Sequence, residues 1–240
     1  MHRSRKIRYA IVFLLLIVAV VTLDVLNVCI GTVKISFHDI LASVRGVEIK
    51  NSRILWDIRA PRSVAAMILG GALALSGYLL QTFFHNPIAG PFVLGISSGA
   101  KMIVALVMVF LMGNSVKVTS WSLIIAAFLG AMISMGFVLL MSRKVTNMSM
   151  LVVSGVMIGY ICSAVTELVV TFANDADIVN LHNWSKGSFS GMTWDNVSFM
   201  KWVVGISFIL VFFLSKPLSA YQLGEYYEKN MGVNIPLLRV

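Results

Sequence analysis

Two arginines stand directly before a long apolar stretch and are the side chains best placed to bind a charged partner. The segment WDIRAPRSVAAMILGG places Arg59 and Arg62 around Pro61. Four more basic residues precede them in the same hydrophilic gap: Lys34, Arg45, Lys50 and Arg53. A basic cluster of this kind can receive an acidic partner, and it can equally be a solvated loop, since lysine and arginine are common at surfaces.

The sequence lacks the motifs that carry the chemistry of common enzymes. The segment GISSGAK departs from a phosphate-binding loop, because Ala100 replaces the second glycine and Met102 replaces the hydroxyl residue that holds magnesium. The 4 histidines form no H-E-x-x-H pair, and no G-x-S-x-G occurs. Cys29 and Cys162 have no metal-binding spacing. We therefore expect no catalytic residue, no metal site and no directly bound cofactor, with any ATP and its magnesium on another chain.

Composition places these residues in a membrane protein. Hydrophobic residues make up 58% of the 240-residue chain and charged residues 12%, a balance that no ordinary soluble domain has. The net charge of +9 does not indicate nucleic-acid binding, because the lysines and arginines fill short gaps between apolar runs instead of forming one basic face.

Six apolar stretches are long enough to cross the roughly 30 Å core of a bilayer as helices. They cover residues 7–30, 64–84, 92–112, 121–141, 148–172 and 197–214. The first is longer than the apolar core of a signal peptide and no A-x-A-like cleavage site follows it, so we expect an anchor that stays in the membrane. The sequence thus predicts an all-α polytopic bundle with a single transmembrane domain over residues 1–240.

The distribution of basic residues predicts the orientation, because cytoplasmic loops carry an excess of lysine and arginine. A cytoplasmic amino terminus also places later basic residues on that side: Arg143, Lys144, Lys216, Lys229 and Arg239. The gap that contains Arg59 and Arg62 then faces outward, against the rule. An external basic cluster that survives this bias favours an acidic partner on the outer side.

Small residues recur at four-residue spacing in several of the predicted helices. The sets are Gly70 with Ala74, Gly95 with Gly99, Ala126 with Gly130 and Ser134, and Gly155 with Gly159 and Ser163. Because such spacing lets transmembrane helices approach one another closely, it predicts a compact bundle.

The segment HNPIAGPFVLGISSGA, which begins at His85, contains the least helical backbone of the chain. Pro87 and Pro91 disfavour helix at Asn86 and Gly90, which we expect to be extended or turned. Non-helical backbone at membrane depth must be buried in protein or line a water-filled cavity. The segment is therefore either a broken stretch that lines a transport pathway or a tight turn on the inner side.

Three ionisable residues lie in or near the apolar runs, where burying a charge is costly: Asp24, Lys101 and Glu167. Asp24 and Lys101 are near enough to helix ends to reach the membrane interface. Glu167 faces either a pathway or the interface.

The stretch RAPRSVAAMILGGALALSGYLLQTFFHNPIAGPFVLGISSGA, which starts at Arg59, resembles the signature of the FecCD/BtuC-type permeases. These are membrane subunits of ATP-binding-cassette (ABC) importers for iron–siderophore complexes, haem and vitamin B12. Ile88 replaces the usual leucine of the family's N-P-L-A turn. WSKGSFSGMTW resembles an outer-face segment of the family, and LGEYYEKNMGV resembles its L-G-E-x-x-A-x-x-L-G-V element, departing at Tyr227 and Met231. Family members have about ten transmembrane helices, so the resemblance implies that the last third is missing here.

The resemblance implies a role for each matched position. Arg59 and Arg62 would receive acidic residues of an external substrate-binding protein, for which a forked guanidinium suits better than lysine; otherwise they reach lipid head groups. The gate or pathway residues would be Asn86, Pro87, Ile88, Met148 and Ser149. An element that couples the chain to the ATPase would span about residues 216–235, with contacts at Leu223, Gly224, Glu225 and Gly232.

The resemblance also implies partners in a bacterial cytoplasmic membrane. These are cytoplasmic ATP-binding subunits, an external binding protein, and a second permease subunit in a homodimer or heterodimer within the lipid bilayer. The chain would be no enzyme itself and would bind no nucleic acid. Two alternatives stay open: a secondary transporter driven by an ion gradient, which would need paired intramembrane carboxylates, and a truncated membrane scaffold that transports nothing.

Overall fold

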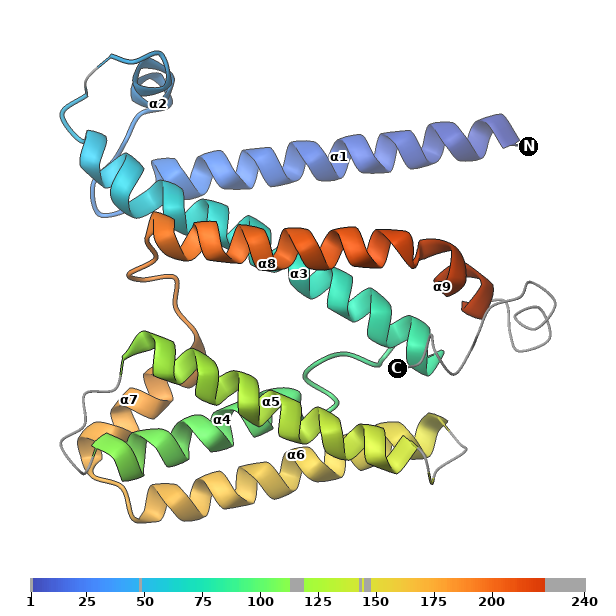
Figure 1. Cartoon of the computed structure of the whole chain (residues 1–240). Coiled ribbons are helices and arrows are strands. Elements are labelled where there is room, and N and C mark those ends of the chain that lie inside the picture. The colour runs from blue at the N-terminus through green and yellow to red at the C-terminus, as the bar shows by residue number, and fades with distance from the viewer. Residues whose placement is uncertain (1, 48, 113–118, 143, 145–147, 223–240) are drawn as a thin grey trace. The chain divides into compact units, whose positions relative to one another are not determined.

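The computed structural model describes residues 2–47, 49–112, 119–142, 144 and 148–222. Every regular element in these ranges is a helix (Figure 1). The helices belong to two compact units. Unit 1 comprises Met1–Gly71 and Phe189–Ser207, and unit 2 comprises Ala72–Ser188 and Phe208–Val240. The division falls inside two long helices, so each of these helices contributes to both units.

The helices confirm the all-α polytopic bundle. Of the stretches in the described part of the chain, 5 are long and apolar enough to cross a membrane: Arg5–Cys29, Ile54–Phe84, Trp121–Ser142, Met150–Thr171 and Trp194–Phe213. A further apolar helix, Ile96–Phe110, is shorter. They follow the predicted apolar stretches in order, but the second begins at Ile54, well before the predicted start at residue 64.

The expected helix over residues 92–112 differs from the structure at its start. Residues 92–95 form a turn, α4 (Ile96–Val107) begins only after Gly95, and a π-helical turn, η2 (Met108–Met112), continues it. The apolar run includes the residues of the turn, whereas hydropathy carries no information on the left-handed backbone of Gly95, whose φ is +70°. The helix is therefore shorter than the apolar run.

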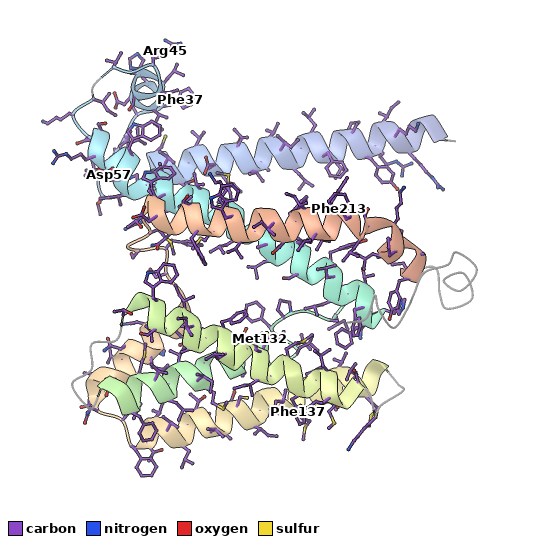
Figure 2. All side chains as sticks on the ribbon, in the orientation of Figure 1. Phe37, Arg45, Asp57, Met132, Phe137 and Phe213 are labelled. Carbon is purple, nitrogen blue, oxygen red and sulfur yellow. The ribbon has the colours of Figure 1, made fainter. Side chains whose placement is uncertain are left out.

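Unit 1 is built at one end of a long apolar helix. α1 (His2–Cys29) is exposed along most of its length, and Figure 2 shows side chains projecting from it throughout. A small core forms only where the helix ends, with Val28, Ile35 and Leu55 buried together. A helix that is apolar on all sides and has no breaking residue suits a lipid environment.

The other elements of unit 1 are short or begin there. They are α2 (Phe37–Val44), η1 (Ile54–Arg59), the start of α3 (Ala60–Phe84) and most of α8 (Trp194–Phe213). Ser36 fixes the start of α2, because its hydroxyl accepts from His38 N–H at 3.3 Å and its own N–H donates to Asp39 Oδ2 at 3.2 Å.

Unit 2 is a helical bundle with α4 between its neighbours. α4 packs against both α5 (Ser120–Ser142) and α6 (Met148–Thr171) (Figure 1). The unit also contains α7 (Asp175–Lys186), the second part of α3, and α9 (Ser215–Gln222).

Two buried clusters hold unit 2 together. In one, Val104 and Met108 pack with Leu181 of α7, and in the other Phe84 of α3 packs with Leu94. Apolar side chains on the outer surface of the bundle, such as Met132 of α5, remain exposed (Figure 2). The bundle thus presents apolar groups both to its core and to its surroundings, as a membrane protein does.

Small residues let α4 approach α5 and α6, as their spacing predicts. A Cβ atom on Gly99 would lie 2.6 Å from the Gly130 carbonyl oxygen, and one on Gly130 would lie 2.7 Å from the Gly99 carbonyl carbon. Gly95 combines its positive φ with a similar approach, since a Cβ there would lie 2.7 Å from the Gly155 carbonyl oxygen. Gly70 differs, because within the described ranges nothing lies within 4 Å of an added Cβ.

Replacing Gly130 with valine should separate α4 from α5. The branched side chain would enter space held by the Gly99 backbone, and overpacking of this kind costs about 1–3 kcal/mol or more. Gly136→Val on the same helix is the matched control, because a Cβ at Gly136 meets nothing within 4 Å. In detergent, we expect Gly130→Val to lower the thermal unfolding midpoint by several degrees relative to Gly136→Val. Equal midpoints would contradict the close approach.

Candidate functional site

The backbone changes its winding just before the first predicted site. In the π-helical turn η1, the carbonyl of Leu55 accepts from Ala60 N–H, and α3 begins at Ala60. Pro61 follows in the first turn of α3, where its fixed φ and missing amide hydrogen are tolerated. Pro61 is buried. This rigid, packed proline therefore fixes the backbone that carries Arg59 and Arg62.

Arg59 caps the end of α1 with its guanidinium. Nη1 donates to the carbonyl of Val28 at 2.5 Å and to that of Cys29 at 3.2 Å, and Nη2 donates to the carbonyl of Val33. The last carbonyls of a helix have no intrahelical partner and form the negative end of its dipole. A half-buried cation at this place supplies both the missing donors and the compensating charge.

Gly31 makes room for this cap. A Cβ atom at Gly31 would collide with the guanidinium of Arg59. The turn after α1 therefore depends on a residue without a side chain at the point where the cation approaches the backbone. Sequence reasoning selected Arg59 for its charge but missed these acceptors, because main-chain carbonyls have no sequence signature.

A second bond joins α1 to α3 near the same end. The Ser63 hydroxyl donates to Asp24 Oδ1, and Ser63 is buried while Asp24 is half-buried. Since a carboxylate within an apolar helix needs a polar partner, this bond accounts for the acidic residue near the end of α1. Arg59 and Ser63, on successive turns, thus fasten α3 to α1.

Arg62 differs from Arg59 in its surroundings. It is also half-buried, but its Nε atom is buried without a hydrogen-bond partner among the described residues. An arginine carries five N–H donors and no acceptor. Nε of Arg62 is therefore a buried donor without a partner among the described residues, whereas the Nη atoms of Arg59 donate to carbonyls near the end of α1.

Two tryptophans connect the motifs around this site. Trp56 Nε1 donates to Ser43 Oγ of α2 at 2.8 Å, and Trp194 Nε1 donates to the carbonyl of Trp56 at 2.8 Å. Trp194 ends the segment WSKGSFSGMTW, while Trp56 begins the segment that contains the arginines. The structure therefore brings together two stretches that lie far apart in the sequence.

The predicted gate begins with a turn directly after α3. Asn86 Oδ1 accepts from Ile88 N–H at 3.0 Å, and the Asn86 carbonyl accepts from Ala89 N–H at 3.1 Å. Pro87 and Ile88 are exposed. The turn is thus ordered by asparagine, as its position before proline predicts, and it presents a proline and an apolar side chain at its surface.

Part of the same segment lines a pocket of about 230 Å³ with α6. Its lining includes Phe92 and Ser98 on one side and Tyr160 and Ser163 on the other, and Ser163 Oγ donates to Ser98 Oγ at 3.5 Å. The volume is below the range of about 300–1,000 Å³ that is usual for small-molecule sites.

The structure describes only some of the remaining predicted positions. Met148 and Ser149 are the first two residues of α6, and their side chains lie outside the described part. The coupling contacts Leu223, Gly224, Glu225 and Gly232 also lie outside the described residues. Of the expected coupling element, the structure describes α9. Glu167 lies on an exposed face of α6, and the described residues contain no cluster of metal ligands.

Comparison with known proteins places these features in a family. The profile of the FecCD transport family matches residues 13–240. The chain is 33% identical over 238 residues to the vitamin B12 import system permease protein BtuC of Klebsiella pneumoniae subsp. pneumoniae, covering 99% of this chain and 67% of that protein. It is 34% identical over 238 residues to BtuC of Salmonella typhi, covering 99% and 69% of the two chains.

The fold is also found in a solved structure of an ABC transporter assigned to the metal-chelate type, in an inward-facing conformation. The TM-score is 0.78 at 24% sequence identity, and the likeness covers 96% of this chain and 70% of the other. At this identity the likeness supports the helical architecture.

The fold and the motifs together define a polytopic membrane permease. The chain belongs to the FecCD transport family. It is a BtuC-like permease subunit, the component of an ABC importer that does not carry the ATPase, and it is shorter than the relatives it matches. The family consists of permeases without a bound cofactor.

Removing the Arg59 cap should destabilise the permease. Arg59→Gln leaves three carbonyls near the end of α1 without their cationic donor, and we expect a loss of about 2 kcal/mol or more in the free energy of unfolding. Arg53→Gln is the control, because Arg53 is an exposed arginine at the N-cap of η1 with no side-chain cap bond. Thermal unfolding in detergent compares them, and an Arg59→Gln midpoint equal to that of Arg53→Gln would show that the cap is dispensable.

Proposed function

We propose that this chain is the translocation subunit of an importer that moves an iron–siderophore complex or a related metal chelate, such as haem or cobalamin, inward. The observation that carries the proposal is the 33–34% identity to vitamin B12 permeases over 99% of the chain. The likeness in fold to a metal-chelate type transporter supports the same class of cargo. The amino terminus would be cytoplasmic, as the basic residues of the later loops favour.

The partners follow from what this chain contains. The sequence has no phosphate-binding loop, so ATP hydrolysis belongs to cytoplasmic partner subunits. A second permease subunit, either another copy or a related chain, would complete the pathway. Alternating access follows, because ATP binding and hydrolysis on the partners would bias the inner and outer gates in turn.

Arg59 and Arg62 would have different roles in docking an external binding protein. Arg59 holds the end of α1 against α3 and so fixes the shape of the docking surface. Arg62, whose side chain is half-buried, would pair its guanidinium with a carboxylate of the binding protein, an interaction that the planar fork favours. The tryptophan contacts to α2 and α8 would keep this surface rigid.

The far end of α3 would carry the inner gate. Arg62 lies in the first turn of α3, and the Asn86–Ile88 turn follows its last residue. The side chains of Asn86, Pro87 and Ile88, with Met148 and Ser149, would close the pathway without binding the cargo strongly. Leu223, Gly224, Glu225 and Gly232 would contact the ATPase.

Uptake assays test the proposal directly. Cells that express the permease with its ATPase and binding protein should accumulate one of three labelled cargos, an iron–siderophore, haem or cobalamin, above cells that lack the permease. An ATPase variant unable to hydrolyse ATP should abolish this uptake. Accumulation that instead follows an ion gradient would indicate a secondary transporter, and no uptake of any cargo would contradict the proposed function.

The same uptake assay distinguishes a specific contact between Arg62 and the binding protein from a general effect of reversing one positive charge. Arg62→Glu should raise the binding-protein concentration for half-maximal uptake about tenfold, which corresponds to about 1.4 kcal/mol. Arg5→Glu is the control, because it makes the same charge reversal on an exposed residue at the other end of α1. If both variants behave like the unmodified permease, Arg62 takes no part in docking.

A further inference from the structure

The short helix α9 completes the carboxyl end of α3. The Tyr221 hydroxyl donates to the carbonyl of Phe83 at 3.1 Å, and Gln222 Nε2 donates to Thr82 Oγ1 at 2.9 Å. Tyr221 and Thr82 are buried. The Phe83 carbonyl is one of the last carbonyls of α3, which lack an intrahelical partner. α9 therefore supplies a donor that the end of α3 needs.

His85 sits at the same helix end in a backbone conformation that favours glycine. Its φ is +46°, its N–H donates to the Thr82 carbonyl at 3.2 Å, and Asn86 N–H donates to the Gln81 carbonyl at 3.2 Å. These two bonds form the Schellman motif, in which glycine usually occupies the left-handed position. A side chain there costs about 1–2 kcal/mol, so the histidine ring calls for a compensating contact.

Tyr221 provides that contact. The rings of His85 and Tyr221 are stacked with centroids 4.7 Å apart and an interplanar angle of 22°. Tyr221 thus holds the residue before Asn86 with its ring and the end of α3 with its hydroxyl. Since α9 has 8 residues, it is too short to be a stable helix by itself. Its conformation depends on this docking.

We propose that Tyr221, supported by Gln222, is a positioning residue that links the ATPase-coupling segment to the inner gate. The Asn86–Ile88 turn lies directly after His85, and the chain passes directly from Gln222 into the predicted coupling contacts. A displacement of that segment by the ATPase would move α9, and α9 would carry the gate turn with it through the stacked rings. This inference rests on the proposed function, because it takes the gate and the coupling segment from there.

Purified permease with its ATPase and binding protein in proteoliposomes provides the test, with cargo uptake and ATP hydrolysis measured together. Tyr221→Ala removes ring and hydroxyl and should lower the cargo moved per ATP about tenfold, within the usual range of coupling between sites, while ATP hydrolysis continues. Tyr221→Phe keeps the ring and should retain most of the coupling. His85→Asn tolerates the left-handed backbone but lacks the ring, so it should resemble Tyr221→Ala.

A chemical cross-link between positions 85 and 221 distinguishes loss of this contact from poor folding of the variants. His85→Cys with Tyr221→Cys, in a protein whose Cys29 and Cys162 are replaced by alanine, should be joined by a short bifunctional thiol reagent. Bridging should restore the cargo moved per ATP relative to the unbridged double variant. Unchanged coupling in Tyr221→Ala, or a bridge that forms without restoring coupling or does not form, would overturn the link. Failure of the proposed function is distinct, because the unmodified permease would then transport nothing.

Discussion

The structure depends on one constraint: the backbone groups at the end of an apolar helix need partners that lipid cannot supply. At the end of α1 the partner is the guanidinium of Arg59, which donates to the carbonyls of Val28, Cys29 and Val33. At the end of α3 the partners are the Schellman bonds and the hydroxyl of Tyr221. Arg59 and Tyr221 are each distant in sequence from the helix end to which they donate, so each contact also joins one helix to another.

In the proposed function, these two helix ends lie at the two places where the permease would meet other proteins. The Arg59 cap would fix the backbone that carries Arg62, the residue proposed to pair with an acidic partner. The Tyr221 contact would tie the proposed gate turn to the segment that ATP hydrolysis would move. If these roles hold, the bonds that satisfy the backbone would also hold the parts that move during transport, and stability and mechanism would share residues.

The sequence predicted the helical architecture well because bilayer thickness imposes a length and a composition on every crossing. It also identified Arg59, Arg62 and the N-P-I-A turn as candidate site residues. It missed what those residues contact, because the acceptors of Arg59 are main-chain carbonyls and because Trp194 reaches Trp56 across 138 residues of sequence. Gly95 shows the same limit, since its left-handed backbone delays the start of the expected helix to Ile96 and its close packing against Gly155 has no signature in hydropathy. Tyr221 lies within the expected coupling element, but nothing in the sequence indicated its contacts with His85 and Phe83.

The central claim is that the segment containing Arg53, Arg59 and Arg62 faces the outside of the cell while α9 faces the cytoplasm. Arg53→Cys and Ser219→Cys place single thiols on exposed residues beside each, in a protein whose Cys29 and Cys162 are replaced by alanine. A membrane-impermeant thiol reagent is then applied to right-side-out and to inverted membrane vesicles. We predict that the thiol at position 53 reacts only in right-side-out vesicles and the thiol at position 219 only in inverted ones. Reaction of both from the same side would contradict the account.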